Sequence, residues 1–188
     1  WPSKRTSAGM TQGIADAAGV YARMKENMVD GKIVEQLQVI SHSRGGAFAN
    51  GYMQGLTAEI QKLAAAEKIE FAYGADNIVQ YSVNLAPHQS NWINYPNNGT
   101  MNVNISHIGD PLSGNDATGN VINVQSIPEK DAFDQHGNKT YNSQLNFILN
   151  ILENNTNPSN LLNEVNAGYQ NYDNSRTNGD KSKVTSGN

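Results

Sequence analysis

The chain has 188 residues, a formal net charge of −4 and no cysteine. The length suits one domain with a real hydrophobic core. The lack of cysteine excludes a disulfide framework, a thiolate zinc site and a cysteine nucleophile, and the mild acidity argues against a nucleic-acid partner. No run of eighteen apolar residues occurs, so we expect no membrane-spanning helix. Trp1 and Pro2 do not begin a signal peptide, and we expect either a domain removed from a longer chain or a processed product.

The first half of the chain predicts a helix, a strand and a second helix. Apolar residues recur at steps of three and four over residues 9–30, and Gly31 stands where a helix often ends in a left-handed residue. The β-branched run 33–40 predicts a strand. One apolar face over residues 47–68 predicts the second long helix.

The second half predicts strands joined by loops, then a helix and a polar tail. We expect strands at 78–85, 101–108 and 121–127 and a helix at 143–152. This order favours an α/β fold whose sheet is largely parallel and flanked by helices. The chain therefore divides into a domain of residues 1–153 and an Asn-rich tail of residues 154–188. In the tail we expect one short helix near Leu161 and disorder beyond Tyr172.

The most informative segment is the turn that follows the first predicted strand, Ser41-His42-Ser43-Arg44-Gly45. Small residues stand two before and two after Ser43, which is a G-x-S-x-G pattern with serine in the first position. A nucleophile at a sharp strand-to-helix turn projects its hydroxyl clear of the sheet, and only small side chains fit beside it. The N-terminus of the helix that follows would then offer backbone N–H groups to a developing oxyanion. An ordinary βα turn that contains serine and glycine is the alternative.

A serine nucleophile needs a base, and the base needs an orienting acid. After such a turn the acid and then the histidine follow the serine in the chain. Asp110 comes just past the predicted strand 101–108, at the carboxyl edge of the sheet, although aspartate before proline is also common in plain turns. Of the four histidines, only His136 follows Asp110; a solvated loop histidine is its alternative. His42 should point away from the nucleophile that it precedes.

These residues resemble a known family. Residues 40–49 resemble the nucleophile elbow of α/β-hydrolases, especially class 3 lipase-like proteins, and more narrowly the lipase-like domains at the C-terminal ends of RHS/YD-repeat polymorphic toxins. The run Ile108-Gly109-Asp110-Pro111-Leu112 resembles the acid motif of those domains, and Gln135-His136-Gly137 falls where their histidine falls. The resemblance covers about residues 10–152.

The resemblance implies a Ser43–His136–Asp110 triad that hydrolyses an ester or lipid through an acyl-enzyme on Ser43, with Arg44 as an oxyanion donor and no cofactor. It also implies a toxin or effector module of a larger protein, which would favour a secreted or cell-surface location. The chain departs from the family because only about thirty residues precede the elbow strand. The front strands and the loop with the second oxyanion donor are missing, and loss of one donor typically costs about 10²–10³ in rate. We therefore expect the C-terminal half of a hydrolase-like sheet, completed by an upstream polypeptide or a partner chain.

Two other functions stay open. The missing strands and Ser41 in place of glycine fit a non-catalytic, hydrolase-like module for binding or assembly. The many asparagines and the aromatic residues Trp92, Tyr95 and Tyr141 fit a carbohydrate-binding or surface protein. Trp92 and Tyr95 are also the candidate substrate contacts, because the connection 86–100 is long enough to form a lid or a pocket wall. The histidines show no metal-ligand spacing.

Overall fold

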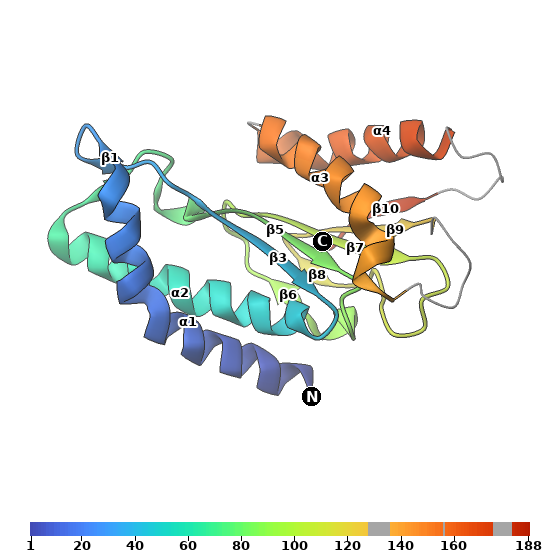
Figure 1. Ribbon diagram of the computed structural model, residues 1–188, viewed down its shortest axis with the longest axis horizontal. Coiled ribbons are helices and arrows are strands. Elements are labelled where there is room, and N and C mark those ends of the chain that lie inside the picture. The colour runs from blue at the N-terminus through green and yellow to red at the C-terminus, as the bar shows by residue number, and fades with distance from the viewer. Residues whose placement is uncertain (128–135, 156, 175–181) are drawn as a thin grey trace.

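The structure is a computed structural model that describes residues 1–127, 136–155, 157–174 and 182–188. The helices are α1 (Pro2–Met24), α2 (Gly45–Glu67), α3 (Asn142–Asn154) and α4 (Leu161–Asn174). The strands are β1 (Met28–Val29), β2 (Lys32–Ile33), β3 (Leu37–His42), β4 (Glu70–Phe71), β5 (Val79–Leu85), β6 (Asn94–Tyr95), β7 (Met101–His107), β8 (Thr118–Gly119), β9 (Ile122–Ser126) and β10 (Lys183–Ser186). Figure 1 shows the main sheet between two pairs of helices, with α1 and α2 on one side and α3 and α4 on the other.

The main sheet has the strand order β10-β9-β7-β5-β3. Neighbouring strands from β3 to β9 are parallel, and β10 runs antiparallel to β9. The fold is therefore mixed α/β with a partly parallel sheet, which confirms the predicted fold class at this level. Among the described residues β3 lies at one edge of the sheet, and its Ile40 is 50% exposed. Two short sheets, β1-β2-β4 and β6-β8, lie outside the main one.

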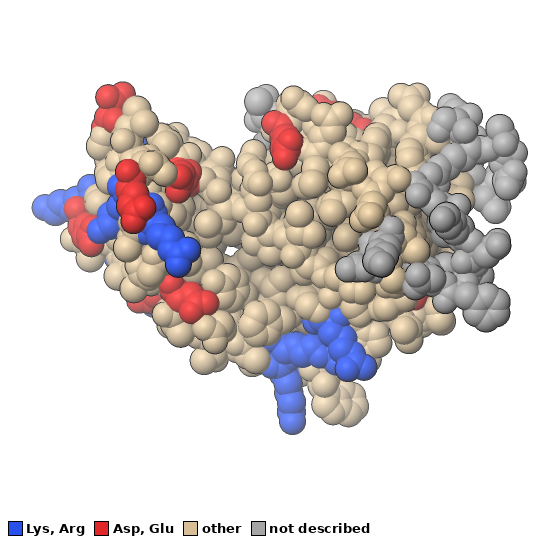
Figure 2. All heavy atoms as spheres, viewed as in Figure 1, with Lys and Arg blue, Asp and Glu red and all other residues tan. Residues whose placement is uncertain are grey.

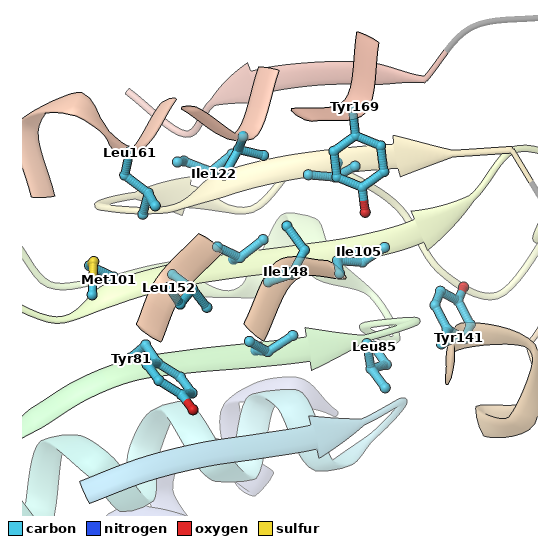
Figure 3. Close-up of a cluster of buried hydrophobic side chains, with 14 of the residues drawn as sticks. Tyr81, Leu85, Met101, Ile105, Ile122, Tyr141, Ile148, Leu152, Leu161 and Tyr169 are labelled. Atoms are coloured by element: carbon cyan, nitrogen blue, oxygen red, sulfur yellow. The ribbon is translucent and has the colours of Figure 1, made fainter. Parts of the chain in front are cut away.

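The largest core lies between the sheet and the pair α3 and α4. Successive side chains of a strand point to opposite faces, and one set of alternate residues in β5, β7 and β9 is apolar and faces these helices: Tyr81, Val83, Leu85, Met101, Val103, Ile105, Ile122 and Val124. Ile148 and Leu152 of α3 and Leu161 and Tyr169 of α4 pack on them, as Figure 3 shows. This burial attaches both C-terminal helices to the sheet.

The opposite face of the sheet is buried but polar. Ser41, Asn84, Asn104 and Asn123 lie opposite one another on β3, β5, β7 and β9. Hydrogen bonds join Ser41 Oγ to Asn84 Oδ1, Asn84 Nδ2 to Asn104 Oδ1 (3.0 Å) and Asn104 Nδ2 to Asn123 Oδ1 (3.3 Å). The Tyr95 hydroxyl donates to Asn104 Oδ1 at 2.9 Å. We call the four sheet residues the asparagine ladder; their mutual bonds supply the partners that buried polar groups need.

Helices α1 and α2 pack through glycines. A Cβ added to Gly9 or Gly13 of α1, or to Gly51 or Gly55 of α2, would overlap the backbone of the other helix. Thr6 lies against Gly51, and the residues four later on each helix also meet, so the two helices run in the same direction. Glycine permits this approach because it has no side chain. The N-terminal ends of α1 and α2 consequently lie at the same end of the molecule (Figure 1).

The predicted N-terminal helix differs from α1 at both ends. Helix α1 begins at Pro2, a favoured residue at the first helical position, and ends at Met24 rather than near residue 30. Asp30 and Gly31 both have positive φ and form the turn of the hairpin in which Val29 pairs with Lys32. The prediction of a helix end at Gly31 was wrong because Asp-Gly is also a signal for a two-residue hairpin turn.

The C-terminal segment contributes more structure than its composition predicts. Helix α4 buries Leu161, Val165 and Tyr169, and β10 pairs with β9 in the register Lys183 opposite Gln125. This differs from the expected disorder beyond Tyr172, because pairing at an existing sheet edge needs backbone groups rather than an apolar sequence. Residues 175–181 of the predicted tail lie outside the described residues. Within the described ranges, no helix is both long and apolar enough to cross a bilayer.

Candidate active site

A strained turn joins β3 to α2 and carries Ser43. The φ angle of Ser43 is 54°, a left-handed conformation that is uncommon for a residue with a side chain. The Ser43 N–H donates to the carbonyl of Leu85 at 2.9 Å, and the Gly46 N–H donates to the carbonyl of Ser43 at 3.2 Å. The surrounding backbone therefore holds the turn in this conformation. The serine stands at the carboxyl edge of the sheet, in front of α2.

The small residues two before and two after Ser43 lie against each other. A Cβ added to Gly45 would lie 3.8 Å from Ser41 Cβ, which is ordinary contact. The hydroxyl of Ser41 hydrogen-bonds Asn84 at the end of the asparagine ladder. Serine in the place of the usual glycine therefore has a structural reason, since its hydroxyl satisfies a buried amide.

The structure brings Ser43, His136 and Asp110 together. Ser43 Oγ lies 2.7 Å from His136 Nε2, and His136 Nδ1 lies 2.8 Å from Asp110 Oδ2. An ionised carboxylate only accepts hydrogen bonds, so Nδ1–H of His136 donates to Asp110. Nε2 of the neutral ring then has a free lone pair and accepts from the serine hydroxyl. This arrangement can take a proton from the serine as the oxygen attacks an electrophile.

Asp110 is buried at the end of β7 and is held ionised. Its side chain also accepts from the Leu112 backbone N–H at 2.9 Å and from the Ser113 hydroxyl at 2.8 Å. Burial by itself would raise the pKa of the Asp110 carboxyl. These two bonds and the one from His136 outweigh that effect and keep the pKa below its ordinary value. The carboxylate is therefore available to orient the imidazole.

The other predicted site residues divide into accessible and buried positions. Arg44 is the N-cap of α2, so its backbone N–H lies at a helix N-terminus directly after Ser43. Trp92 is 63% exposed in the connection 86–100. Tyr95 is 2% exposed, and its hydroxyl is part of the buried network around the asparagine ladder. We therefore keep Trp92, and not Tyr95, as a candidate substrate contact.

Two further histidines lie against the site, and the sequence predicted neither contact. His42 Nε2 is 2.7 Å from the backbone oxygen of His136, so the His42 side chain reaches the same histidine as its neighbour Ser43 does. The backbone N–H of His88 donates to the carbonyl of Ser43 at 3.2 Å. Burial lowers the pKa of the His88 imidazole. From its place next to Ser43, the sequence predicted only that the His42 side chain points away from the serine, and it gave no signal for the contact with His136.

Within the described part of the chain, no three His, Asp or Glu side chains gather as metal ligands would. No family model, curated protein or solved structure matches this chain. The chemistry of the site therefore follows from the contacts of Ser43, His136 and Asp110.

Proposed function

We propose that this chain is a serine hydrolase domain that cleaves carboxylic esters. One observation carries the proposal. Ser43, which has a positive φ, lies with its Oγ 2.7 Å from His136 Nε2, and His136 Nδ1 lies 2.8 Å from Oδ2 of the buried Asp110. Ser43 and His136 are 93 positions apart in the chain and Asp110 and His136 are 26 apart. Three distant segments thus supply the nucleophile, the base and the orienting acid that acyl transfer requires.

The reaction proceeds in two halves. Ser43 Oγ attacks the ester carbonyl carbon while its proton moves to His136 Nε2, and Asp110 stabilises the imidazolium that forms. The backbone N–H of Arg44 donates to the oxyanion. The imidazolium then protonates the leaving alkoxide, which departs as the alcohol and leaves the acyl group on Ser43. His136 then deprotonates a water molecule, which attacks the acyl carbon. The bond to Ser43 Oγ breaks, the imidazolium returns the proton to this oxygen, and the acid leaves the free serine.

The finer identity of the fold belongs to the same proposal. The order of strand, turn with Ser43, helix and three further parallel strands supports the C-terminal half of an α/β-hydrolase-like sheet. Asp110 after β7 and His136 after β9 follow the chain order of acid and histidine in that fold. The similarity of residues 40–49 to lipase-like RHS/YD-repeat domains supports an effector or toxin module, which would act outside the cell that makes it.

The edge of the sheet at β3 supports a partner. The strand that precedes the nucleophile is central in a complete hydrolase sheet, yet here β3 lies at an edge of the described sheet with Ile40 half exposed. Unpaired edges with apolar side chains tend to pair with another strand. We therefore include in the proposal an upstream polypeptide or partner chain that pairs with β3 and brings the second oxyanion donor.

The two other candidate functions lose support from the same observations. A non-catalytic module does not need Ser43, His136 and Asp110 within hydrogen-bond reach of one another, and here they are. A carbohydrate-binding surface needs accessible aromatic faces, but of the three aromatic residues that suggested this function Tyr95 and Tyr141 are buried and Trp92 alone is exposed.

Covalent labelling tests the proposal. A fluorophosphonate probe should modify Ser43 in the folded chain, and Ser43→Ala should abolish the labelling while the far-UV circular dichroism and the melting temperature stay near those of the wild type. Ser7→Ala removes an exposed serine of α1 and should leave labelling unchanged. The proposal is refuted if Ser43 stays unlabelled both in this chain and in a chain that carries any natural upstream region.

A further inference from the structure

His42 contacts the main chain of the residue that carries the proposed catalytic base. Its Nε2 lies 2.7 Å from the backbone oxygen of His136, and the two rings are 5.4 Å apart and tilted by 53°. A carbonyl oxygen can only accept a hydrogen bond, so the hydrogen lies on His42 Nε2. His42 is therefore a donor here, and its Nε2–H is not available as a base for Ser43.

The contact matters because His136 must satisfy two partners at once. Its ring spans from Ser43 Oγ to Asp110 Oδ2, with both distances below 3 Å. A displacement of about 1 Å at a reacting group can cost about 10² in rate. The ring bonds fix the imidazole only if the main chain of residue 136 stays in place. The bond from His42 holds that main chain, while Thr140 holds the next carbonyl, that of Gly137, from the C-terminal side.

The donor comes from the same turn as the nucleophile. His42 is the last residue of β3, and Ser43 follows it in the strained conformation that the Leu85 carbonyl anchors. One rigid turn thus supplies both the oxygen that the imidazole must reach and the N–H that holds the imidazole's own backbone. Because His42 and Ser43 are adjacent in the chain, the distance between the His42 donor and Ser43 Oγ does not depend on how distant elements pack.

We propose that His42 is a positioning residue, whose Nε2–H fixes the backbone of His136 so that its imidazole bridges Ser43 and Asp110. This inference rests on the proposed function, since it assigns a task to His42 in the same site. It requires that His42 carries its hydrogen on Nε2, and that a residue able to replace His42 also has a side-chain N–H donor.

Substitution at position 42 separates positioning from folding. His42→Leu removes the donor and should lower kcat for an ester, and the rate of fluorophosphonate labelling, by roughly 100-fold with little change in KM. His42→Gln keeps an N–H donor and should recover most of the rate. Gln38→Leu places the same apolar residue on the same face of β3, where the Gln38 side chain bonds only Gln80, and should leave the rate unchanged. Equal rates for wild type and His42→Leu would overturn the inference while leaving the proposed function intact.

Histidine NMR tests the inference independently of catalysis. In the wild type, ¹⁵N shifts should show that His42 carries its hydrogen on Nε2, and a downfield proton should report the bond from His136 Nδ1 to Asp110. His42→Leu should broaden or abolish that downfield signal, whereas Gln38→Leu should keep it. A wild-type His42 in the Nδ1–H tautomer overturns the inference even if no variant folds. A persisting signal in His42→Leu overturns it even if the chain proves to hydrolyse nothing.

Discussion

Asn84 on β5 and Asn104 on β7 lie directly opposite each other and are joined amide to amide at 3.0 Å beneath the turn that carries Ser43. Both side chains are buried, and each also bonds the next member of the asparagine ladder. Parallel strands buried on both faces usually present continuous apolar residues. Here one face is apolar and the other is a hydrogen-bonded polar network, which fixes the register of β3 against β5.

Asn84→Leu should destabilise the fold. The substitution leaves Ser41, Tyr95 and Asn104 with fewer partners in a buried place, and each unsatisfied group costs about 1–3 kcal/mol. We expect a loss of more than about 2 kcal/mol in the free energy of unfolding, measured by urea denaturation. Gln80→Leu on the same strand is the control, since Gln80 bonds an exposed partner, Gln38. Equal losses in the two variants would argue against the ladder as a stabilising network.

Asp110→Asn should abolish most of the activity without unfolding the chain. An amide at this position no longer selects the tautomer in which His136 Nε2 accepts from Ser43, and such a change typically lowers kcat by about 10⁴. Ester hydrolysis and the labelling rate of Ser43 measure the effect. Asp116→Asn changes an exposed aspartate near the same loop, bonded to Ser90, and should keep the rate. A rate within tenfold of the wild type for Asp110→Asn would contradict the assigned role.

Two Gly→Ala substitutions in helices should act in opposite directions. In Gly51→Ala the new methyl group meets the backbone of Thr6, and overpacking of this kind costs typically about 1–3 kcal/mol. In Gly19→Ala the methyl group meets nothing, so the higher helix propensity of alanine should stabilise α1 by roughly 0.5–1 kcal/mol. In thermal unfolding, the melting temperature of Gly51→Ala should therefore lie below that of the wild type and the melting temperature of Gly19→Ala above it. A stabilising Gly51→Ala would mean that α1 and α2 do not pack as described.

Acidification should destabilise the fold in two stages. Burial lowers the pKa of His88, and the nearby charges of Arg5 and Arg44 lower it further, against a hydrogen bond with the Leu112 carbonyl that raises it. The pKa of Asp110 is also lowered. In both cases the unfolded chain binds protons more readily, so the stability present above the unfolded pKa is lost as pH falls.

The first loss should begin below about pH 6.5, the ordinary pKa of histidine, and the second below about pH 3.9, that of aspartate. Urea denaturation between pH 8 and pH 3 measures both. The first stage should be smaller in His88→Gln and the second smaller in Asp110→Asn. Stability that rises as the pH falls from 7 to 5 would contradict the direction predicted for His88.

Trp92→Ala should change the preference among esters. The exposed Trp92 lies in the same connection 86–100 as His88, whose backbone N–H donates to the Ser43 carbonyl. Our hypothesis is that the indole contacts the acyl or alcohol part of a substrate. We expect the ratio of kcat/KM for long and short acyl chains to shift by about tenfold or more. Leu162→Ala, an exposed apolar residue on α4, is the matched control. An unchanged ratio would mean that Trp92 only packs on the loop.

The sequence predicted the main elements because their signals are local. The boundaries of α2, β5, β7, β9 and α3 lie within one or two residues of the predicted ones, since each has a strong apolar period. Ser43, Asp110 and His136 were selected by spacing and chain order, and the structure brings all three together.

The remaining features depend on contacts that composition does not encode. Asn84 and Asn104 alternate with apolar residues as solvent-facing positions do, yet they are buried, because their partners come from other strands. The pairing of β10 with β9 needs a ready edge rather than an apolar sequence. The direction of the His42 side chain goes with its contact to the backbone oxygen of His136, which comes 94 positions later in the chain.

The two borders of the main sheet differ in chemical character. On one side β10 presents Lys183, Thr185 and Ser186, and its charged and hydroxyl groups discourage a further strand from joining. On the other side β3 ends one residue before Ser43 and leaves Ile40 half exposed. A further strand is therefore more readily added at β3 than at β10, and a strand that extends the described sheet there would also lie beside Ser43, the proposed nucleophile.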